Sequence, residues 1–318
     1  MNLRIGSRGS QLALWQANHI AQLLDAKGHT VEIEVIKTTG DRLQESAFVQ
    51  AGSKGIFTKE IEEALAEGRI DLAVHSLKDL PTELAEAFTL AAIPRREDPR
   101  DAFVAVKCSH LAGLHRGAKI GTSSLRRRAQ LKAVRPDIEV VEFRGNVETR
   151  LRKLAEGQVD AIVLAAAGLK RLGKTEFLRE RLSTTEFCPA AGQGALGIES
   201  RKDDAAAIAA VSFLDDAETR FAVTVERAAL AALGGGCQVP IGVLCRTRSE
   251  SSFETEEDWR RDDVWAMVTD PETGANVCVG HSEPREGSDP VVLGRLVAKK
   301  LLDKGAGPLL EARGEGSR

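Results

Sequence analysis

Two internal echoes in the sequence constrain the fold more than any other feature. The run Leu65-Ala66-Glu67-Gly68-Arg69-Ile70-Asp71 returns as Leu154-Ala155-Glu156-Gly157-Gln158-Val159-Asp160, and Arg4-Ile5-Gly6-Ser7 returns as Lys119-Ile120-Gly121-Thr122. The first echo predicts a helix that leads into a strand, and the second predicts a strand that leads into a hydroxyl-bearing loop. A repeated β-α-β unit requires parallel strands covered by helices. We therefore expect two similar α/β domains that face each other across a cleft. The alternative is that unrelated parts of an α/β fold reuse one junction.

Hydrophobic periodicity, capping residues and glycines predict alternating strands and helices through the first two hundred residues. Near the N-terminus these are a strand over 3–5, a helix capped by Ser10 that runs to Lys27, a strand over 31–35, a helix over 58–67 and a buried strand over 70–74. The polar, glycine-containing stretch over 43–55 predicts a long mobile loop.

The pattern changes after about Asp215. The predicted elements there are a helix over 217–233, strands over 241–245, 264–269 and 276–280, and a closing helix from about 288 to 305. Between them, Glu250–Asp263 carries seven acidic residues against Arg260 and Arg261, which we interpret as a solvated excursion. The expected fold is α/β with a small α+β C-terminal domain. Its domains are 1–95 with a return segment at about 195–214, then 96–194, and then 215–318.

Composition excludes several classes of protein. The 318 residues carry 44 Lys and Arg against 47 Asp and Glu, and aromatic residues make up 4% with no Tyr, so a dedicated nucleic-acid binder is not expected. The charge-free stretch over 205–214 is ten residues long, and none in the sequence reaches the roughly 20 residues that a membrane-spanning helix needs. The N-terminus shows no signal-peptide pattern, so we expect a cytoplasmic protein. Five cysteines without a C-x-x-C spacing predict neither a disulfide framework nor a zinc site, and no metal is expected.

Positive charge is concentrated in the middle of the chain. The segment Arg116–Arg152 holds ten Lys and Arg against four acidic residues. Within it, Gly121-Thr122-Ser123-Ser124 and Phe143-Arg144-Gly145-Asn146 each end a predicted strand and open a predicted helix. Such loops present backbone N–H groups to anions, and in open α/β sheets they converge on the ligand. The segment therefore predicts a site for a polyanion with carboxylates or phosphates; the alternative is a solvated helix face.

Two further loops carry reactive side chains. The loop His75-Ser76-Leu77-Lys78-Asp79-Leu80-Pro81 places a carboxylate for proton transfer beside an ammonium group, or else forms a turn with a surface ion pair. We interpret His75 as a structural residue. Gly234-Gly235-Gly236-Cys237 presents a cysteine after three glycines, which favours either a nucleophile or covalent attachment point or a buried structural thiol.

Together these motifs resemble the porphobilinogen deaminase family, also called hydroxymethylbilane synthase. The resemblance rests on the three loops above, extended as Thr122-Ser123-Ser124-Leu125-Arg126-Arg127, Arg144-Gly145-Asn146-Val147 and Cys237-Gln238-Val239-Pro240-Ile241-Gly242, and on Ser7–Ala13, Lys54–Phe57, Ala165–Leu172 and Gly192–Glu199. These motifs run in order from residue 7 to residue 242. Each motif alone is weakly specific, but the set is highly specific.

The resemblance implies a transferase that joins four porphobilinogen molecules head to tail into the linear tetrapyrrole hydroxymethylbilane, with release of ammonia, in porphyrin and haem biosynthesis. It implies two domains similar to periplasmic binding proteins and a covalent dipyrromethane cofactor held as a thioether on Cys237. Asp79 is implied as the catalytic acid and base. The implied partner is the small-molecule substrate alone, without nucleic acid or membrane, and the implied state is a monomer.

The resemblance also assigns binding roles, residue by residue. The side chains implied to bind cofactor and substrate are Arg8, Ser10, Lys78, Thr122, Ser124, Arg126, Arg127, Arg144, Arg150 and Arg171. Phe57, Gln16 and Gln193 are implied to cover the site or pack against it. The competing interpretation is a non-catalytic two-lobed binding module for a polycarboxylate, which would need neither the Cys237 loop nor a third domain. A phosphate-handling transferase lacks a nucleotide fingerprint in this sequence.

Overall fold

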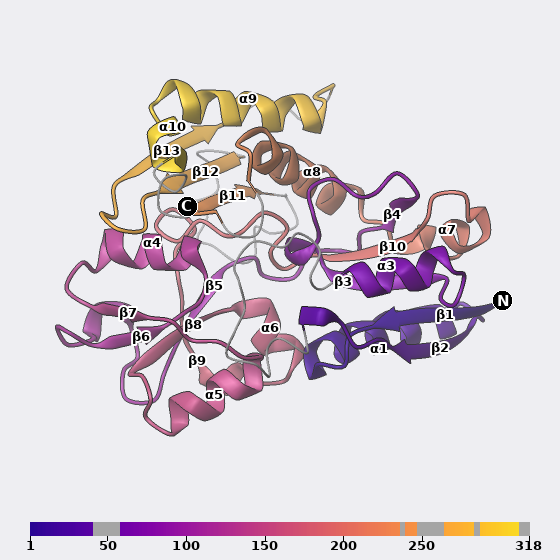
Figure 1. The fold of residues 1–318 in the computed structure, drawn as a ribbon, viewed down its shortest axis with the longest axis horizontal. Helices are drawn as coiled ribbons and strands as arrows, with labels where there is room; N and C mark the ends of the chain where they lie inside the picture. Colours follow the sequence, from indigo (N-terminus) through magenta and orange to yellow (C-terminus); the bar gives the residue numbers. More distant parts are fainter. Residues whose placement is uncertain (41–57, 236–238, 247–263, 283–286, 312–318) are drawn as a thin grey trace.

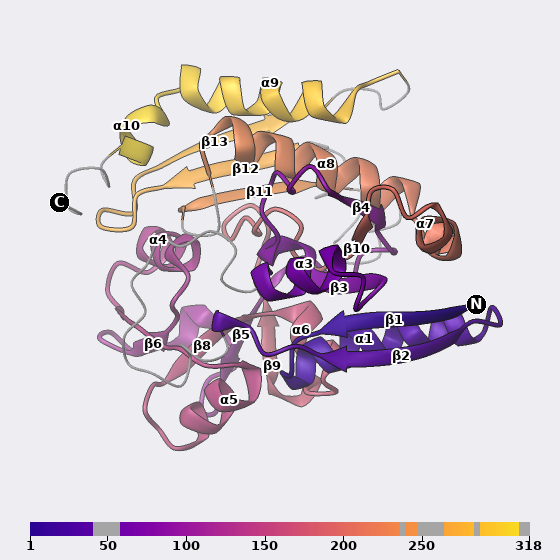
Figure 2. The same cartoon turned by 45° about the vertical axis from the view of Figure 1, so that its right-hand side comes forward.

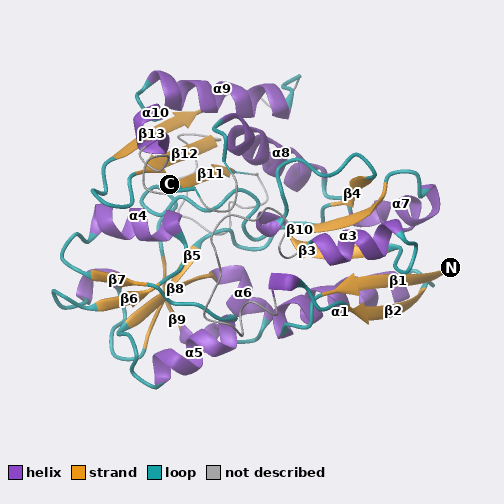
Figure 3. Cartoon of the chain, in the orientation of Figure 1, coloured by secondary structure: helices purple, strands orange, loops and turns teal. Residues whose placement is uncertain are grey.

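The computed structural model describes residues 1–40, 58–235, 239–246, 264–282 and 287–311 (Figure 1). Within these ranges the strands form three sheets, and helices cover them (Figure 3). Short 3-10 turns lie at η1 (Leu77–Asp79), η2 (Leu111–Gly113), η3 (Thr175–Phe177) and η4 (Ser212–Leu214). The predicted mobile loop over 43–55 and the acidic segment Glu250–Asp263 lie outside the described residues.

The first sheet has the strand order β2-β1-β3-β10-β4. Its strands are β1 (Asn2–Ser7), β2 (Thr30–Val35), β3 (Leu72–Ser76), β4 (Phe88–Ala92) and β10 (Leu196–Arg201). Strand β1 is parallel to β2 and β3, whereas β10 is antiparallel to β3 and β4. Helices α1 (Gln11–Asp25) and α7 (Ala205–Val211) contribute to one hydrophobic cluster with this sheet, and α3 (Lys59–Ala66) contributes to another.

The second sheet repeats this plan in the order β7-β6-β8-β5-β9. Its strands are β5 (Asp101–Ala105), β6 (Lys119–Gly121), β7 (Glu139–Val141), β8 (Ala161–Ala165) and β9 (Leu178–Arg181), and its helices are α4 (Leu125–Val134), α5 (Val147–Ala155) and α6 (Ala166–Arg171). Strand β6 is parallel to β7 and β8, and β5 is antiparallel to β8 and β9, as in the first sheet. The echoed runs occupy equivalent places before β3 and β8. The prediction of two similar α/β units is therefore confirmed.

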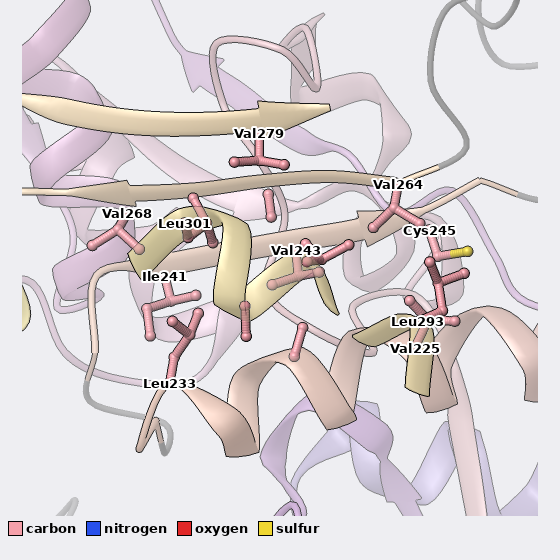
Figure 4. Packing of buried hydrophobic residues seen from close by; sticks show 14 of the residues in the cluster. Val225, Leu233, Ile241, Val243, Cys245, Val264, Val268, Val279, Leu293 and Leu301 are labelled. Atoms are coloured by element: carbon pink, nitrogen blue, oxygen red, sulfur yellow. The ribbon is translucent and has the colours of Figure 1, made fainter. Parts of the chain in front are cut away.

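The third sheet, β11-β12-β13, is antiparallel and completes the predicted α+β part. Its strands are β11 (Ile241–Cys245), β12 (Val264–Thr269) and β13 (Asn276–His281), and its helices are α8 (Ala217–Ala232), α9 (Pro290–Asp303) and α10 (Gly307–Glu311). Valines and leucines from the helices interlock with the strands (Figure 4). Helix α9 approaches α8 closely at Gly294, where a Cβ atom would lie 2.4 Å from the carbonyl oxygen of Val225. Figure 2 shows both helices beside this sheet.

One predicted strand is displaced. The strand expected over 70–74 lies at Leu72–Ser76, so His75 is inside it. The reason is Asp71, whose carboxylate accepts hydrogen bonds from the backbone and side chain of Arg4 and so fixes the turn before the strand. His75 contacts Glu199 at 3.0 Å, which confirms its structural interpretation. None of the described helices is long and apolar enough to cross a membrane.

A buried ion pair joins the three sheets. Arg96, on the segment that leads from the first sheet to the second, contacts Glu226 of α8 at 2.6 Å, and both side chains are almost fully buried. Arg96 also donates to the carbonyl of Gln193 at 2.7 Å on the returning segment. Glu226 accepts from the backbone N–H of Gly192 and of Cys245. One pair therefore fixes both connecting segments to the C-terminal unit.

Glu226→Gln is expected to lower the free energy of unfolding by about 3–5 kcal/mol, because Arg96 would stay buried without its carboxylate. Urea unfolding measures this change, with Glu86→Gln on an exposed turn as the control. Replacing both partners by leucine should restore part of the loss, since no unpaired charge remains. A Glu226→Gln protein within about 1 kcal/mol of the unmodified chain would contradict this role.

Candidate functional site

The predicted site residues follow the carboxyl ends of parallel strands. Turn η1, with Lys78 and Asp79, follows β3, while Thr122 and Ser124 follow β6. Ser124 caps α4 by accepting from the N–H of Arg127, and Ser10 caps α1 in the same way after β1. Thr122 accepts from the N–H of Ser124 at 3.2 Å. In the structure these hydroxyl groups therefore cap helices or stabilise the loops that lead into them.

Asp101 is the centre of a buried network that the sequence did not reveal. Its carboxylate accepts from Arg126 at 2.8 Å, from two nitrogens of Arg127 at 3.1 and 2.7 Å, and from Gln193 at 2.9 Å. The two arginines hold the pKa of this carboxyl far below its usual range, despite complete burial. Arg126 also donates to Gln130 and to the carbonyl of Cys188. These contacts give Arg126 a structural role in the described chain.

Gln193 connects this network to the first sheet. Its amide nitrogen donates to Asp101 and to the carbonyl of Pro99, whereas its oxygen lies 3.4 Å from the Lys78 ammonium and 3.5 Å from Arg127. The side chain is fully buried. Gln193 therefore places a lysine from one unit next to an arginine from the other.

Lys78 and Asp79 differ in their surroundings. Burial and the positive charge of Arg127 lower the pKa of Lys78 to about 8. Asp79 is exposed at the end of turn η1. Strand β3 and its hydrogen bonds to β10 fix the start of this turn, since the N–H of Leu77 donates to the carbonyl of Ala195. The loop thus offers an accessible carboxylate beside a desolvated ammonium group.

Two arginines are held with little compensation by acids. Burial lowers the pKa of Arg150 to about 10, assisted by the charge of Arg127, and its Nε atom is buried without a hydrogen-bond partner in the described part of the chain. Its Nη2 donates to Ser123 at 3.3 Å. Burial also lowers the pKa of Arg171 to about 10, and its guanidinium donates to the carbonyl of Gly194. A desolvated guanidinium with an orphaned donor indicates an anionic ligand.

The remaining predicted residues are less constrained. Arg144 is exposed and contacts Glu142 at 2.6 Å, and Arg8 is half-buried after β1. Gln16 is buried and donates to Ser76 at 2.8 Å, beneath the Lys78 turn. Phe57 and Cys237 lie outside the described residues.

Three of the described cysteines lie in surroundings that do not favour a nucleophile. Cys188 is fully buried, and burial raises the pKa of its thiol far above the usual range. Burial also raises the pKa of Cys278, and Cys245 is buried in the third sheet. Among the described residues no group of three or more potential metal ligands comes together. The described loops offer cations that can bind an anion beside the exposed carboxylate of Asp79.

Comparisons with known proteins agree along nearly the whole chain. The family model "Porphobilinogen deaminase, dipyromethane cofactor binding domain" matches residues 3–209, and "Porphobilinogen deaminase, C-terminal domain" matches residues 220–303. The curated porphobilinogen deaminase of Chromobacterium violaceum is 48% identical over 310 residues, which cover 97% of this chain and 96% of that protein. That of Geobacter sulfurreducens is 55% identical over 251 residues, which cover 78% of this chain and 79% of that protein.

A distant likeness to a solved structure of a binding protein accompanies these matches. A putative methionine-binding lipoprotein from Bacillus subtilis aligns over 69% of this chain and 92% of its own, at 15% identity and a TM-score of 0.43. This score is too low to support an argument.

Proposed function

The chain belongs to the porphobilinogen deaminase family. We propose that its cofactor and the growing pyrrole chain are bound through their carboxylates by a set of cations, called here the cations around Asp101: Lys78, Arg127, Arg150 and Arg171. The reaction joins four porphobilinogen molecules into hydroxymethylbilane and releases ammonia, and the cofactor is a dipyrromethane. Each pyrrole added brings an acetate and a propionate, so negative charge accumulates. The chain meets this charge with arginines and Lys78, although its own net charge is −3.

The single observation that carries the binding proposal is the desolvated Arg150. Its orphaned Nε atom and its lowered pKa mark a largely buried cation that forms no ion pair with a carboxylate among the described residues. The carboxylates of a dipyrromethane fit this need. Arg127, Lys78, Arg171 and Arg150 would hold them, while Arg126 and Asp101 keep Arg127 in place. When bound, the cofactor supplies the pyrrole carbon to which the first substrate is joined.

Asp79 is proposed as the group that moves protons at the substrate. Ammonia loss needs a proton at the leaving amine, and joining two pyrroles places positive charge on ring nitrogens before a ring proton leaves. An exposed carboxylate can accept and return these protons and stabilise that charge. Lys78 carries the opposite charge and is suited to a substrate carboxylate instead.

Cys237 is proposed as the attachment point of the cofactor, held through a thioether. The support is its match to the family motif Gly236-Cys237-Gln238-Val239-Pro240 and the buried thiols of Cys188 and Cys245. The same family membership leads us to propose a cytoplasmic monomer and the domain division given above. A non-catalytic binding module is not favoured, because the models of the dipyromethane cofactor binding domain and of the C-terminal domain both match.

The test of this function is the purified, unmodified chain. Its intact mass should exceed the sequence mass by one dipyrromethane, and it should consume porphobilinogen with release of four ammonia for each tetrapyrrole. A protein of unmodified mass that consumes no porphobilinogen, even after incubation with the substrate, would contradict the proposal.

Arg150→Met and Arg126→Met are expected to separate binding from stability. Arg150→Met should leave the free energy of unfolding unchanged or higher, because a desolvated cation is removed, yet slow chain growth about 10-fold or more. Arg126→Met should lower stability, since Asp101 loses a buried partner. Urea unfolding, intact mass and porphobilinogen consumption are measured on both. Normal turnover in a stable Arg150→Met protein would remove Arg150 from the site.

A further inference from the structure

A cavity of about 390 Å³ lies between helix α8, helix α9 and the segment 82–93 around β4. None of its lining residues belongs to the site described above. Leu90, Ile93, Val223 and Val291 are among its apolar lining residues. Figures 1 and 2 show α8 beside β4 and α9 beside α8, so the cavity lies where the first and third sheets meet.

Three arginines line this cavity: Arg220, Arg227 and Arg295. Asp215 holds the Arg220 guanidinium at 2.6 and 2.7 Å, and Arg220 also donates to the carbonyl of Leu90. Arg227 donates to the carbonyls of Pro81 and Thr82 at 2.5 and 3.1 Å. Two guanidinium groups are thus fixed in orientation before any ligand arrives.

The charges at the cavity favour an anion. Arg295 is exposed and makes no hydrogen bond or ion pair with the described residues. Glu83 is the acidic residue among those that line the cavity, and Asp215 is taken up by Arg220. Arg220 and Arg227 are engaged by Asp215 and by backbone carbonyls, so Arg295 supplies the guanidinium fork that can match a ligand carboxylate in geometry and charge. A small inorganic anion would leave the apolar wall of the cavity in contact with water. An organic ligand would cover that wall, so its binding is favoured by burial of apolar surface.

We propose that this cavity binds an organic carboxylate with an apolar body, whose carboxylate pairs with Arg295 and lies beside Arg227. The site is distinct from the cationic group around Asp101. It offers room for a ligand of one aromatic ring and a short acid chain.

The cavity is also connected to the reaction. The carbonyls that Arg227 holds, at Leu80, Pro81 and Thr82, follow directly after Asp79 in the chain. A carboxylate beside Arg227 competes with these carbonyls for the guanidinium and loosens the segment. Occupation of the cavity is therefore expected to slow turnover; this second step rests on the proposed role of Asp79.

The binding test uses 4-phenylbutyrate as the probe in isothermal titration calorimetry with the cofactor-loaded protein. The controls are inorganic phosphate and the neutral 4-phenylbutanol. Arg295→Gln removes a lining charge, and Ala231→Leu fills the cavity; Lys299→Gln makes the same charge change on the exposed face of α9. Urea unfolding checks that each variant is folded.

We expect 4-phenylbutyrate to bind the unmodified and Lys299→Gln proteins with equal affinity. Its affinity for Arg295→Gln should be about 10-fold lower, and its binding to Ala231→Leu should be undetectable. Phosphate and the alcohol should bind more weakly than the acid. Equal binding of the acid to all four proteins would overturn the proposal, because it would place the probe elsewhere, including the cations around Asp101. Equal binding of phosphate would overturn the organic ligand class.

The connection to the reaction is tested by porphobilinogen consumption with saturating 4-phenylbutyrate. Turnover should fall in the unmodified and Lys299→Gln proteins and stay unchanged in Ala231→Leu. Slowing that persists in Ala231→Leu would contradict the connection and indicate competition at the substrate site. The calorimetric result does not depend on activity, so failure of this inference is distinguishable from failure of the proposed function.

Discussion

Cys237→Ala protein is expected to show the unmodified sequence mass and to consume no porphobilinogen. A thioether requires the sulfur atom, and alanine offers no atom to which a pyrrole can be joined. Without an anchored first pyrrole, the cations around Asp101 have no fixed chain end to hold. Intact-mass spectrometry and substrate consumption on freshly purified protein measure both consequences.

The control for Cys237 is the set of other cysteines. Cys108→Ala and Cys278→Ala, at two partly buried thiols, should each keep the adduct and the turnover. Peptide mapping of the unmodified protein locates the adduct directly. An adduct on Cys108, Cys188, Cys245 or Cys278 would show that the assignment to Cys237 is wrong.

Asp79→Asn is expected to fold normally and to turn over at least ~100-fold more slowly, because positioned acid–base catalysis contributes roughly 10²–10⁴-fold. Asparagine has nearly the same shape, and Asp79 is exposed, so the turn after β3 should persist. The amide cannot accept and return a proton or balance the positive charge on a pyrrole nitrogen. Asp79→Glu should lie between, since it keeps the charge and shifts its position.

The measurement for Asp79 is single-turnover consumption of porphobilinogen on samples matched for cofactor content. Intact mass provides that match, because a slow variant could also be poorly loaded. Glu86→Gln, on an exposed turn seven residues further along, is the charge-matched control and should retain full activity. An Asn variant within a few-fold of the unmodified protein would remove Asp79 from proton transfer.

Much of the fold could be predicted from local sequence signals. Strands β11 and β12 begin and end at the predicted residues because each is a short apolar run. The two echoes predicted two similar α/β units, which the two five-stranded sheets confirm, since a glycine-stopped helix before a buried strand has the same local sequence pattern in both. The displacement of β3 arose from Asp71, whose partner Arg4 lies 67 residues away.

The sequence indicated candidate site residues but not the contacts between them. The family motifs indicated Lys78, Arg127 and Gln193, yet Asp101 carries no local signal beyond being the first residue of a buried strand. Its partner Gln193 is 92 residues away, and Arg96 meets Glu226 across 130 residues. Such pairs exist only after the sheets are placed against one another, so neither periodicity nor spacing reveals them.

The position of β10 has a consequence for the order in which the chain can fold during synthesis. Strand β10 lies between β3 and β4, although it follows them in the chain by more than a hundred residues. All strands of the second sheet lie between Asp101 and Arg181, so that sheet is complete before β10 has been made. A ribosome delivers the N-terminal part first. The first sheet therefore keeps an unpaired edge at β3 until β10 is translated. The second sheet, although its strands are translated after β1 to β4, can be completed earlier.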